Sequence, residues 1–595
     1  MDNHEMGWDL AQLVPSTNPD LILEQLNFMI TEANKLRDTY HNKIKYLDAN
    51  GLLKLLEVKD TFALNFEGAT MYCDLIYAAN SMIDVNKKLN DSVRTVLMIV
   101  SQALAFIDLE IGTLLVEKSL LVNDPLLAEY KHYLERILRR VPHMLSETEE
   151  RLIILKDRNG INAWQTLQSN WLSTRAYSIN IDGKPEKLTY GKIIGLYQCP
   201  DRDLRRRANQ VVYEELGRDE ILWASAIRSI CSDHLQMSEL RKFPNPMAQS
   251  LIANDVDQRT IESLIITVEK NVRLYQRYLR LKAKLMNLPI LANYDILAPL
   301  IDVLDTNYTW EESRKVIIDA YSRFDEKLGA WVEEMFEKRH IDGEIRNGKR
   351  SGAFCASWLV GKSAYILQSF NGRLGDVYTQ AHELGHAVHA YLASRAQKPS
   401  NIEIGSCIAE CGSIFGELLL TEQLLSKAKT KMEKRQILSK ILDEFGMVVF
   451  QVSARIFFEQ SLYNAIKKGE FLDGEKVARL WIDARDKIYG GSVEWLDVMK
   501  WEWTMKGHYY IPNYRFYNYP YVFAQLFVFA LFSLYKEEGE EFIPKLDRLL
   551  AAGSSKSPYV LGFELGFDIS SELFWNKGIK QAEKFVDDLE ATLTD

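Results

Sequence analysis

The sequence predicts a mainly α-helical protein, and three observations support this prediction. Proline is rare, at 15 of 595 residues. Long segments carry apolar residues at positions i, i+3, i+4 and i+7, a spacing that places them on one face of a helix. The breaks between these segments are short clusters of turn-forming residues. The clearest helical segments are residues 27–46, 92–117, 126–155 and 260–285.

One short region departs from the helical pattern. Residues 351–358 and 363–370 are rich in small and aromatic residues, and the second segment ends at a turn-forming Asn371–Gly372 pair. These features predict two β-strands in an otherwise helical protein. Further upstream, Pro200 to Arg202 predicts the start of a helix with Asp201 as its cap.

The length and the turn pattern predict two domains. A single hydrophobic core is not expected to serve 595 residues. The helical pattern is broken by turn-forming residues at 182–185, so a boundary is placed close to that point. We therefore predict an N-terminal helical domain over residues 1–190 and a larger, mostly helical domain over residues 191–595.

Composition excludes several functional classes. The 82 acidic residues outnumber the 72 Lys and Arg, and a net charge of −10 argues against nucleic acid or an anionic membrane as the main partner. Six scattered cysteines with no Cys-x-x-Cys pair suit a reducing compartment. The first residues lack a signal-peptide pattern, and the longest strongly apolar stretch, near 521–535, is shorter than the roughly 20 residues that span a bilayer. We expect a cytoplasmic protein without nucleic acid or membrane partners.

The chemistry is concentrated in a His-Glu-x-x-His pattern. His382 and His386 are four residues apart, so on a helix both imidazoles share one face and can bind one zinc ion. Glu383 lies next to them and can approach a metal-bound water. Asp376 is available to cap the helix start. The alternative is a pair of core histidines, which a chain with only 10 histidines makes less favoured.

A catalytic zinc ion needs a third protein ligand, and Glu410 is the candidate. It lies 24 residues after His386 and is surrounded by small residues that would let two helices approach closely. Glu403 and Glu417 lie seven residues to either side, where a carboxylate can hold the second nitrogen of a zinc-bound imidazole, and Glu403 is the predicted one. The alternative for these acids is a solvated acidic stripe.

A second cluster combines one histidine with many tyrosines. His508 and six tyrosines fall within 14 residues, and their polar groups suggest donors aimed at a substrate carbonyl. The alternative is a tyrosine-rich helix interface.

Three blocks together resemble one family. Residues 382–389, residues 403–410, and His508 with residues 516–521 are similar to the oligoendopeptidase F branch of the thimet-oligopeptidase-like zinc metallopeptidases, which includes the Pz-peptidases. This resemblance implies a mainly α, two-lobed helical ellipsoid of the zincin (gluzincin) type. It also implies a deep channel with zinc on its floor, and a small β-sheet beside the zinc helix that binds peptide main chain by strand addition.

The resemblance also assigns roles by position. It implies that His382, His386 and Glu410 bind one zinc ion per chain and that Glu383 is the general base. His508 is implied to contact the substrate and the oxyanion together with a tyrosine, for which Tyr517 is favoured and Tyr514 comes second. The remaining predicted substrate contacts are Ala364, Tyr365, Ile366, Tyr519 and Tyr521.

The predicted function is therefore zinc-dependent hydrolysis of internal peptide bonds in short peptides. Two alternatives stay open. One is a zinc carboxypeptidase on a similar helical fold, which uses the same ligands. The other is a catalytically inactive peptide-binding protein, although every residue that catalysis requires is present. The oligomeric state, monomer or homo-oligomer, is left open.

Overall fold

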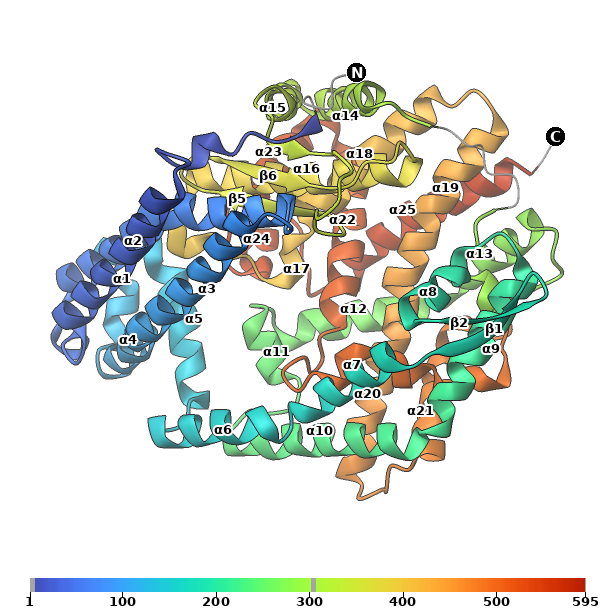
Figure 1. Cartoon of the computed structure of the whole chain (residues 1–595), viewed down its shortest axis with the longest axis horizontal. Coiled ribbons are helices and arrows are strands. Elements are labelled where there is room, and N and C mark those ends of the chain that lie inside the picture. The colour runs from blue at the N-terminus through green and yellow to red at the C-terminus, as the bar shows by residue number, and fades with distance from the viewer. Residues whose placement is uncertain (1–5, 301–306, 594–595) are drawn as a thin grey trace. The chain divides into compact units, whose positions relative to one another are not determined.

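The computed structural model describes residues 6–300 and 307–593 (Figure 1). Helices make up 73% of it, which confirms the predicted fold class. The chain divides into two compact units, each assembled from three segments. Unit 1 comprises Met1–Val141, Asp305–Lys427 and Leu531–Asp568, and unit 2 comprises Pro142–Leu304, Ala428–Ala530 and Ile569–Asp595. The predicted contiguous domains, 1–190 and 191–595, divide the chain differently, and that division of the sequence stays a prediction.

In unit 1, helices come before and after a small sheet along the sequence. Its helices are α1 (Pro19–Tyr40), α2 (Ala49–Ala79), α3 (Asp84–Leu104), α4 (Phe106–Glu117), α5 (Lys131–Arg140), α14 (Trp310–Phe324), α15 (Glu326–Glu337), α16 (Leu374–Ala396), α17 (Ser406–Ala409), α18 (Cys411–Lys427), α23 (Ile543–Ala551) and α24 (Pro558–Glu564). Its strands are β4 (Ile341–Asp342), β5 (Phe354–Trp358) and β6 (Ser363–Leu367).

Unit 2 is also mainly helical. Its helices are α6 (Glu147–Asn159), α7 (Ala163–Thr174), α8 (Tyr190–Gly195), α9 (Arg202–Arg218), α10 (Glu220–Leu240), α11 (Ala248–Ala253), α12 (Gln258–Lys270), α13 (Val272–Leu285), α19 (Lys431–Phe445), α20 (Val452–Lys467), α21 (Gly474–Tyr489) and α25 (Glu572–Ala591). Its strands are β1 (Tyr177–Ile181), β2 (Lys184–Leu188), β3 (Leu291–Ala292) and β7 (Val493–Glu494). Helix α22 (Tyr519–Glu538) begins in unit 2 and ends in unit 1.

The predicted helices exist, but several are broken where the apolar pattern runs on. The predicted helix 92–117 is divided between α3 and α4, and the predicted helix 260–285 between α12 and α13. The predicted helix 126–155 is interrupted around Pro142, because proline has no N–H to donate and its ring clashes with the preceding turn. Asp201 caps α9 as predicted, since its carboxylate accepts N–H groups of the first turn.

The strands near the metal-binding motif form a three-stranded sheet in the order β4-β6-β5. Strand β6 is central: it pairs antiparallel with β5, Trp358 opposite Ser363, and parallel with β4. Its five residues are all buried. The sheet lies beside α16 (Figure 1), which carries the His-Glu-x-x-His pattern.

One helical stretch of the described residues, Asp84–Glu117, is long and apolar enough by composition to cross a membrane. It comprises α3 and α4, and 39% of its most apolar window is buried. The core helices of soluble proteins meet the same criterion.

Candidate metal centre and active site

Helix α16 holds the motif in a defined register. The carboxylate of Asp376 accepts the backbone N–H groups of Asn371 and Arg373, at 2.8 and 3.0 Å. These bonds satisfy donors at the helix start that have no partner within the helix. Asp376 therefore caps the helix as predicted, although it does so from the third helical position.

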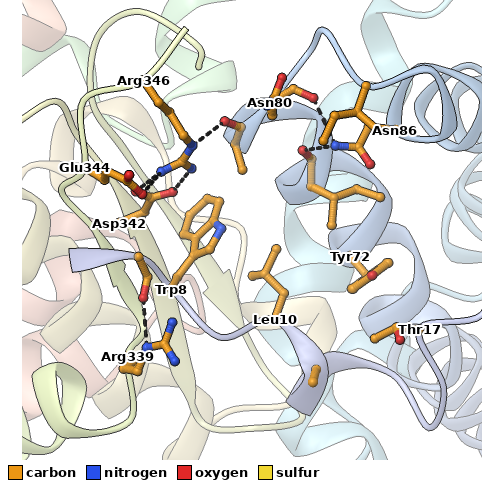
Figure 2. Close-up of a pocket in the computed structure, with 15 residues that line it drawn as sticks. Trp8, Leu10, Thr17, Tyr72, Asn80, Asn86, Arg339, Asp342, Glu344 and Arg346 are labelled. Atoms are coloured by element: carbon orange, nitrogen blue, oxygen red, sulfur yellow. Dashed lines mark hydrogen bonds and ion pairs between the residues drawn. The ribbon is translucent and has the colours of Figure 1, made fainter. Parts of the chain in front are cut away.

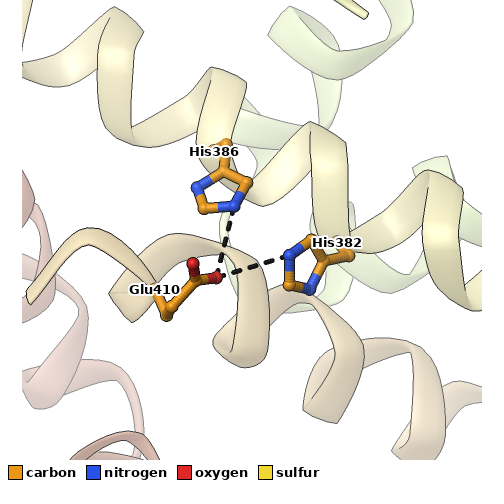
Figure 3. A group of neighbouring side chains, drawn as sticks. All are labelled: His382, His386 and Glu410. Atoms are coloured by element: carbon orange, nitrogen blue, oxygen red, sulfur yellow. Dashed lines mark ion pairs between the residues drawn. The ribbon is translucent and has the colours of Figure 1, made fainter. Parts of the chain in front are cut away.

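The structure brings His382, His386 and Glu410 together (Figure 3). The Nε2 atoms of both imidazoles lie 3.3 Å from Oε2 of Glu410, and one ligand atom from each residue lies within 4.8 Å of the others. Zinc bonds of about 2.0–2.1 Å at tetrahedral angles place neighbouring ligand atoms about 3.3 Å apart. The three side chains therefore have the donor types and the spacing that a zinc ion requires.

A close contact between two helices permits this spacing. A Cβ atom on Gly412 of α18 would lie 2.2 Å from the carbonyl oxygen of Gly385 on α16, and the reverse contact is equally short. One turn further along α18, a Cβ on Gly416 would lie 2.2 Å from the hydroxyl of Tyr321. Only glycine fits at these contacts, so the small residues around Glu410 bring α18 against the zinc helix.

Glu417, and not Glu403, holds the second nitrogen of a candidate ligand. Nδ1 of His382 donates to Oε1 of Glu417 at 2.6 Å, and Glu417 is buried. Glu403 is exposed, and among the described residues it contacts neither imidazole. The seven-residue spacing fails on this side because α17 spans only Ser406–Ala409, whereas α18 is continuous from Cys411 to Lys427.

The neighbouring polar groups set the charge of Glu410. Burial opposes its ionisation, but hydrogen bonds from both imidazoles hold the pKa of Glu410 well below its usual range. The hydroxyl of Ser413 also donates to its Oε2 at 2.6 Å. Glu410 is therefore a carboxylate, the form that binds a metal ion. Ser413 is one of the small residues around Glu410, and the sequence pattern alone gives it no further role.

Glu383 lies on the same helix and is almost fully buried. Burial raises the pKa of its carboxyl group, and the imidazoles of His382 and His386 oppose the rise. Helix α16 packs against β5, and Cys355 of β5 lies close enough for the charge of Glu383 to add to the effect of burial, which raises the pKa of that thiol. The edge strand of the sheet therefore runs beside the candidate base.

The structure contradicts the predicted substrate contacts on β6. Ala364, Tyr365 and Ile366 are each 0% exposed. Strand β6 lies between two other strands: β5 pairs with all five of its residues, and β4 pairs with Ile366 and Leu367. The hydroxyl of Tyr365 donates to the backbone carbonyl of Asp9 at 3.0 Å. These residues are part of the core of unit 1, and the strand at the open edge of the sheet is β5.

Within unit 2, His508 and three of the predicted tyrosines form one cluster. The rings of Tyr514 and Tyr517 stack at 4.3 Å between centroids, and the ring of His508 stacks on Tyr517 at 5.9 Å. The hydroxyl of Tyr521 lies 3.4 Å from Nε2 of His508. Tyr514 and Tyr521 are each 40% exposed, so the cluster is accessible to a ligand.

Tyr519 does not belong to this cluster. It is 1% exposed, and its hydroxyl contacts the side chains of Ser250 in α11 and of Asn254, the residue that follows α11. Because the side chain points into the core of unit 2, the predicted substrate contact is wrong. Tyr517 contacts the rings of His508 and Tyr514, whereas Tyr519 is buried against α11.

A buried ion pair supports the segment that carries His508. Glu459 of α20 lies 3.9 Å from Arg515, and both side chains are 2% exposed. Arg515 donates to the backbone carbonyl of His508. Oε1 of Glu459 accepts the N–H of Phe516 at 2.9 Å, and Phe516 has the unfavourable φ of 55°. The sequence does not predict roles for Glu459 and Arg515, because neither belongs to a recognised motif.

A separate cavity of about 470 Å³ in unit 1 lies beside Trp8, Arg339 and Arg346 (Figure 2). Its charged groups are paired locally: Arg346 with Asp342 and Glu344, and Arg339 with a backbone carbonyl of the N-terminal segment at 3.0 Å. None of the predicted site residues lines it.

Comparison with known proteins gives matches over most of the chain. Oligopeptidase PepF of Bacillus subtilis (strain 168) is 26% identical over 467 residues, which are 78% of this chain and 69% of that protein. A solved structure from Chlamydophila abortus has a TM-score of 0.89 at 20% identity and covers 100% of this chain and 99% of its own. The crystal structure of oligoendopeptidase-F from Enterococcus faecium has a TM-score of 0.69 at 20% identity, with 97% and 99% covered.

Two family models match the sequence. The model described as Oligopeptidase F matches residues 117–174. The model described as Peptidase family M3 matches residues 195–580, which is more than half of the chain and includes the metal group, Glu383 and the His508 cluster. The chain therefore belongs to peptidase family M3.

Proposed function

We propose that this protein is a zinc-dependent endopeptidase that hydrolyses internal bonds of short peptides. The observation that carries the proposal is the 3.3 Å spacing of the two imidazole Nε2 atoms from Oε2 of Glu410. Membership of peptidase family M3 implies a metal ion, and the donor set favours one zinc ion per chain, held by His382, His386 and Glu410.

The chain's own groups have distinct roles in this proposal. When bound, the zinc ion polarises a water molecule and the scissile carbonyl. Glu383 accepts a proton from the attacking water and passes it to the leaving amine. Glu417 keeps the proton of His382 on Nδ1, which leaves the lone pair of Nε2 for the metal. His508 with Tyr517 or Tyr514 donates hydrogen bonds to the developing oxyanion.

The peptide main chain is proposed to add to β5. This strand lies at the edge of the sheet, and its residues are partly exposed, in contrast to the buried β6. An extended peptide can continue the sheet there through backbone hydrogen bonds. The proximity of Cys355 to Glu383 supports this position.

Two further expectations remain proposals. The six cysteines are all free, which fits action on peptides in the reducing cytoplasm. The two family models end and begin at residues 174 and 195, which supports a sequence boundary near residue 190.

The test uses an internally quenched peptide blocked at both ends. We expect cleavage that a chelator abolishes and added zinc restores. Glu383→Gln should retain zinc, measured by mass spectrometry, and lose nearly all turnover. Release of residues only from a free C-terminus would favour the carboxypeptidase alternative. Binding of zinc and peptide without any cleavage would favour the inactive peptide-binding alternative.

A further inference from the structure

Arg455 lies in the middle of an apolar helix and has no counter-ion in the part of the chain that the structure describes. Between Glu444 and Lys467 the only charged residues are Arg455 and Glu459, one turn apart on α20. Glu459 pairs with Arg515. The guanidinium group of Arg455 has no hydrogen bond, ion pair or ring contact with any described residue, and its Nε atom is buried without a partner.

Arg455 lies against the segment that carries His508. The hydroxyl of Tyr509 donates to the backbone carbonyl of Arg455 at 3.0 Å. The positive charge of Arg455 also acts on two members of the aromatic cluster: after burial, it lowers the pKa of His508, and it opposes the rise that burial causes in the pKa of Tyr521. Helix α20 therefore carries Arg455, a partly buried residue, next to the segment that holds the cluster.

The other cations around His508 have their charges balanced. Burial lowers the pKa of His508, as do Arg455, Arg515 and Lys506. Lys506 lies 2.7 Å from Glu502, and Arg515 pairs with Glu459. Among the described residues, Arg455 is the one of these three cations that forms no ion pair with a carboxylate. A partly buried charge without a partner is costly, so this group is set to receive an anion from outside the chain.

We propose that Arg455 binds a carboxylate of the peptide substrate beside His508 and Tyr521, and so gives the enzyme a preference for peptides with an anionic group. The proposal rests on the peptidase function proposed above and makes Arg455 a specificity-determining residue. A guanidinium group binds a carboxylate through two parallel hydrogen bonds. The carboxylate has two possible sources, the C-terminus of a short peptide or the side chain of an acidic residue.

Two matched pairs of quenched peptides distinguish these sources. One pair differs only in a C-terminal acid or amide, and the other only in Glu or Gln at an interior position. We expect wild-type protein to favour the acid of one pair. Arg455→Met should lower kcat/KM for that acid peptide by about 10- to 100-fold, mainly through KM, and bring the acid-to-neutral ratio close to 1. Arg455→Lys should retain part of the preference.

Lys467→Met is the matched control, because it removes one positive charge from the exposed end of the same helix. It should keep the wild-type ratio. An unchanged ratio in Arg455→Met, or an equal loss of kcat/KM for all four peptides, would overturn the proposal. If the wild-type protein cleaves no peptide, the peptidase function fails. In that case, fluorescence anisotropy measures the binding of the same peptides to zinc-loaded Glu383→Gln protein, with and without Arg455→Met. The ratio of the affinities for the acid and neutral peptides then decides the carboxylate preference.

Discussion

Nδ1 of His382 donates a hydrogen bond to Oε1 of Glu417 at 2.6 Å, and Glu417 is only 4% exposed. This contact fixes which imidazole nitrogen carries the proton and which faces Glu410. A buried carboxylate on the rear of a candidate ligand orients the ring and raises its basicity.

The first prediction concerns this contact. Glu417→Gln should weaken zinc binding by about 10- to 100-fold, because the amide is a poorer acceptor for the imidazole N–H. Titration with zinc buffers checks the affinity. Glu403→Gln is the matched control and should bind zinc like the wild type, since Glu403 is exposed. A larger effect at Glu403 than at Glu417 would show that the sequence prediction, and not the structure, has the correct carboxylate.

The second prediction concerns the contact between α16 and α18. Gly412→Ala places a methyl group only 2.2 Å from the carbonyl oxygen of Gly385, so the helices must separate. We expect a loss of about 1–3 kcal/mol in the free energy of unfolding, together with weaker zinc binding. Gly375→Ala is the control: it lies in the first turn of α16 with nothing within 4 Å of its Cβ position. It should be neutral or stabilise by up to about 1 kcal/mol. Urea unfolding of both variants measures the difference.

The third prediction concerns acid sensitivity. Burial lowers the pKa of His340 from 6.5 to about 4, and no described residue forms a hydrogen bond with its Nε2. The unfolded chain then binds more protons than the folded chain below pH 6.5, so stability falls as the pH drops through this value. At pH 5 the loss from this one group is about 2 kcal/mol. The stability difference between the wild type and His340→Gln should therefore shrink by that amount from pH 7 to pH 5, in urea titrations of metal-free protein. A constant difference across this range would contradict the lowered pKa.

The sequence was sufficient for the metal group because helical spacing is local. His382, Glu383 and His386 lie on one continuous helix, so their relative positions follow from four-residue spacing alone. Glu410 could be found because small residues around it predict a close helix contact, which Gly412 provides.

The predictions failed where the position of a residue depends on how separate segments of the chain are arranged. Glu403 was chosen by helical spacing, but the chain before Glu410 is not one helix. Ala364 to Ile366 were assigned to an accessible strand, although the order of strands in a sheet cannot be read from two short segments, and β4 occupies the other edge. Tyr519 shares its chemistry with Tyr517, and only the backbone conformation at Phe516 and beyond determines which ring is buried.

The last prediction concerns the ion pair between Glu459 and Arg515. Removing either partner leaves the other buried without a counter-ion, so Glu459→Gln and Arg515→Met should each cost about 3–5 kcal/mol in the free energy of unfolding. The double variant should cost less than the sum, because no uncompensated charge remains.

If the pair between Glu459 and Arg515 served the fold alone, its removal would change only the stability of the protein. Since Arg515 also donates to the carbonyl of His508, we expect Arg515→Met to lower kcat for peptide cleavage at temperatures where it is fully folded, and Arg515→Lys to restore part of it. Additive effects in the unfolding cycle would show that the two residues act independently, and wild-type kcat in Arg515→Met would show that the pair does not position His508.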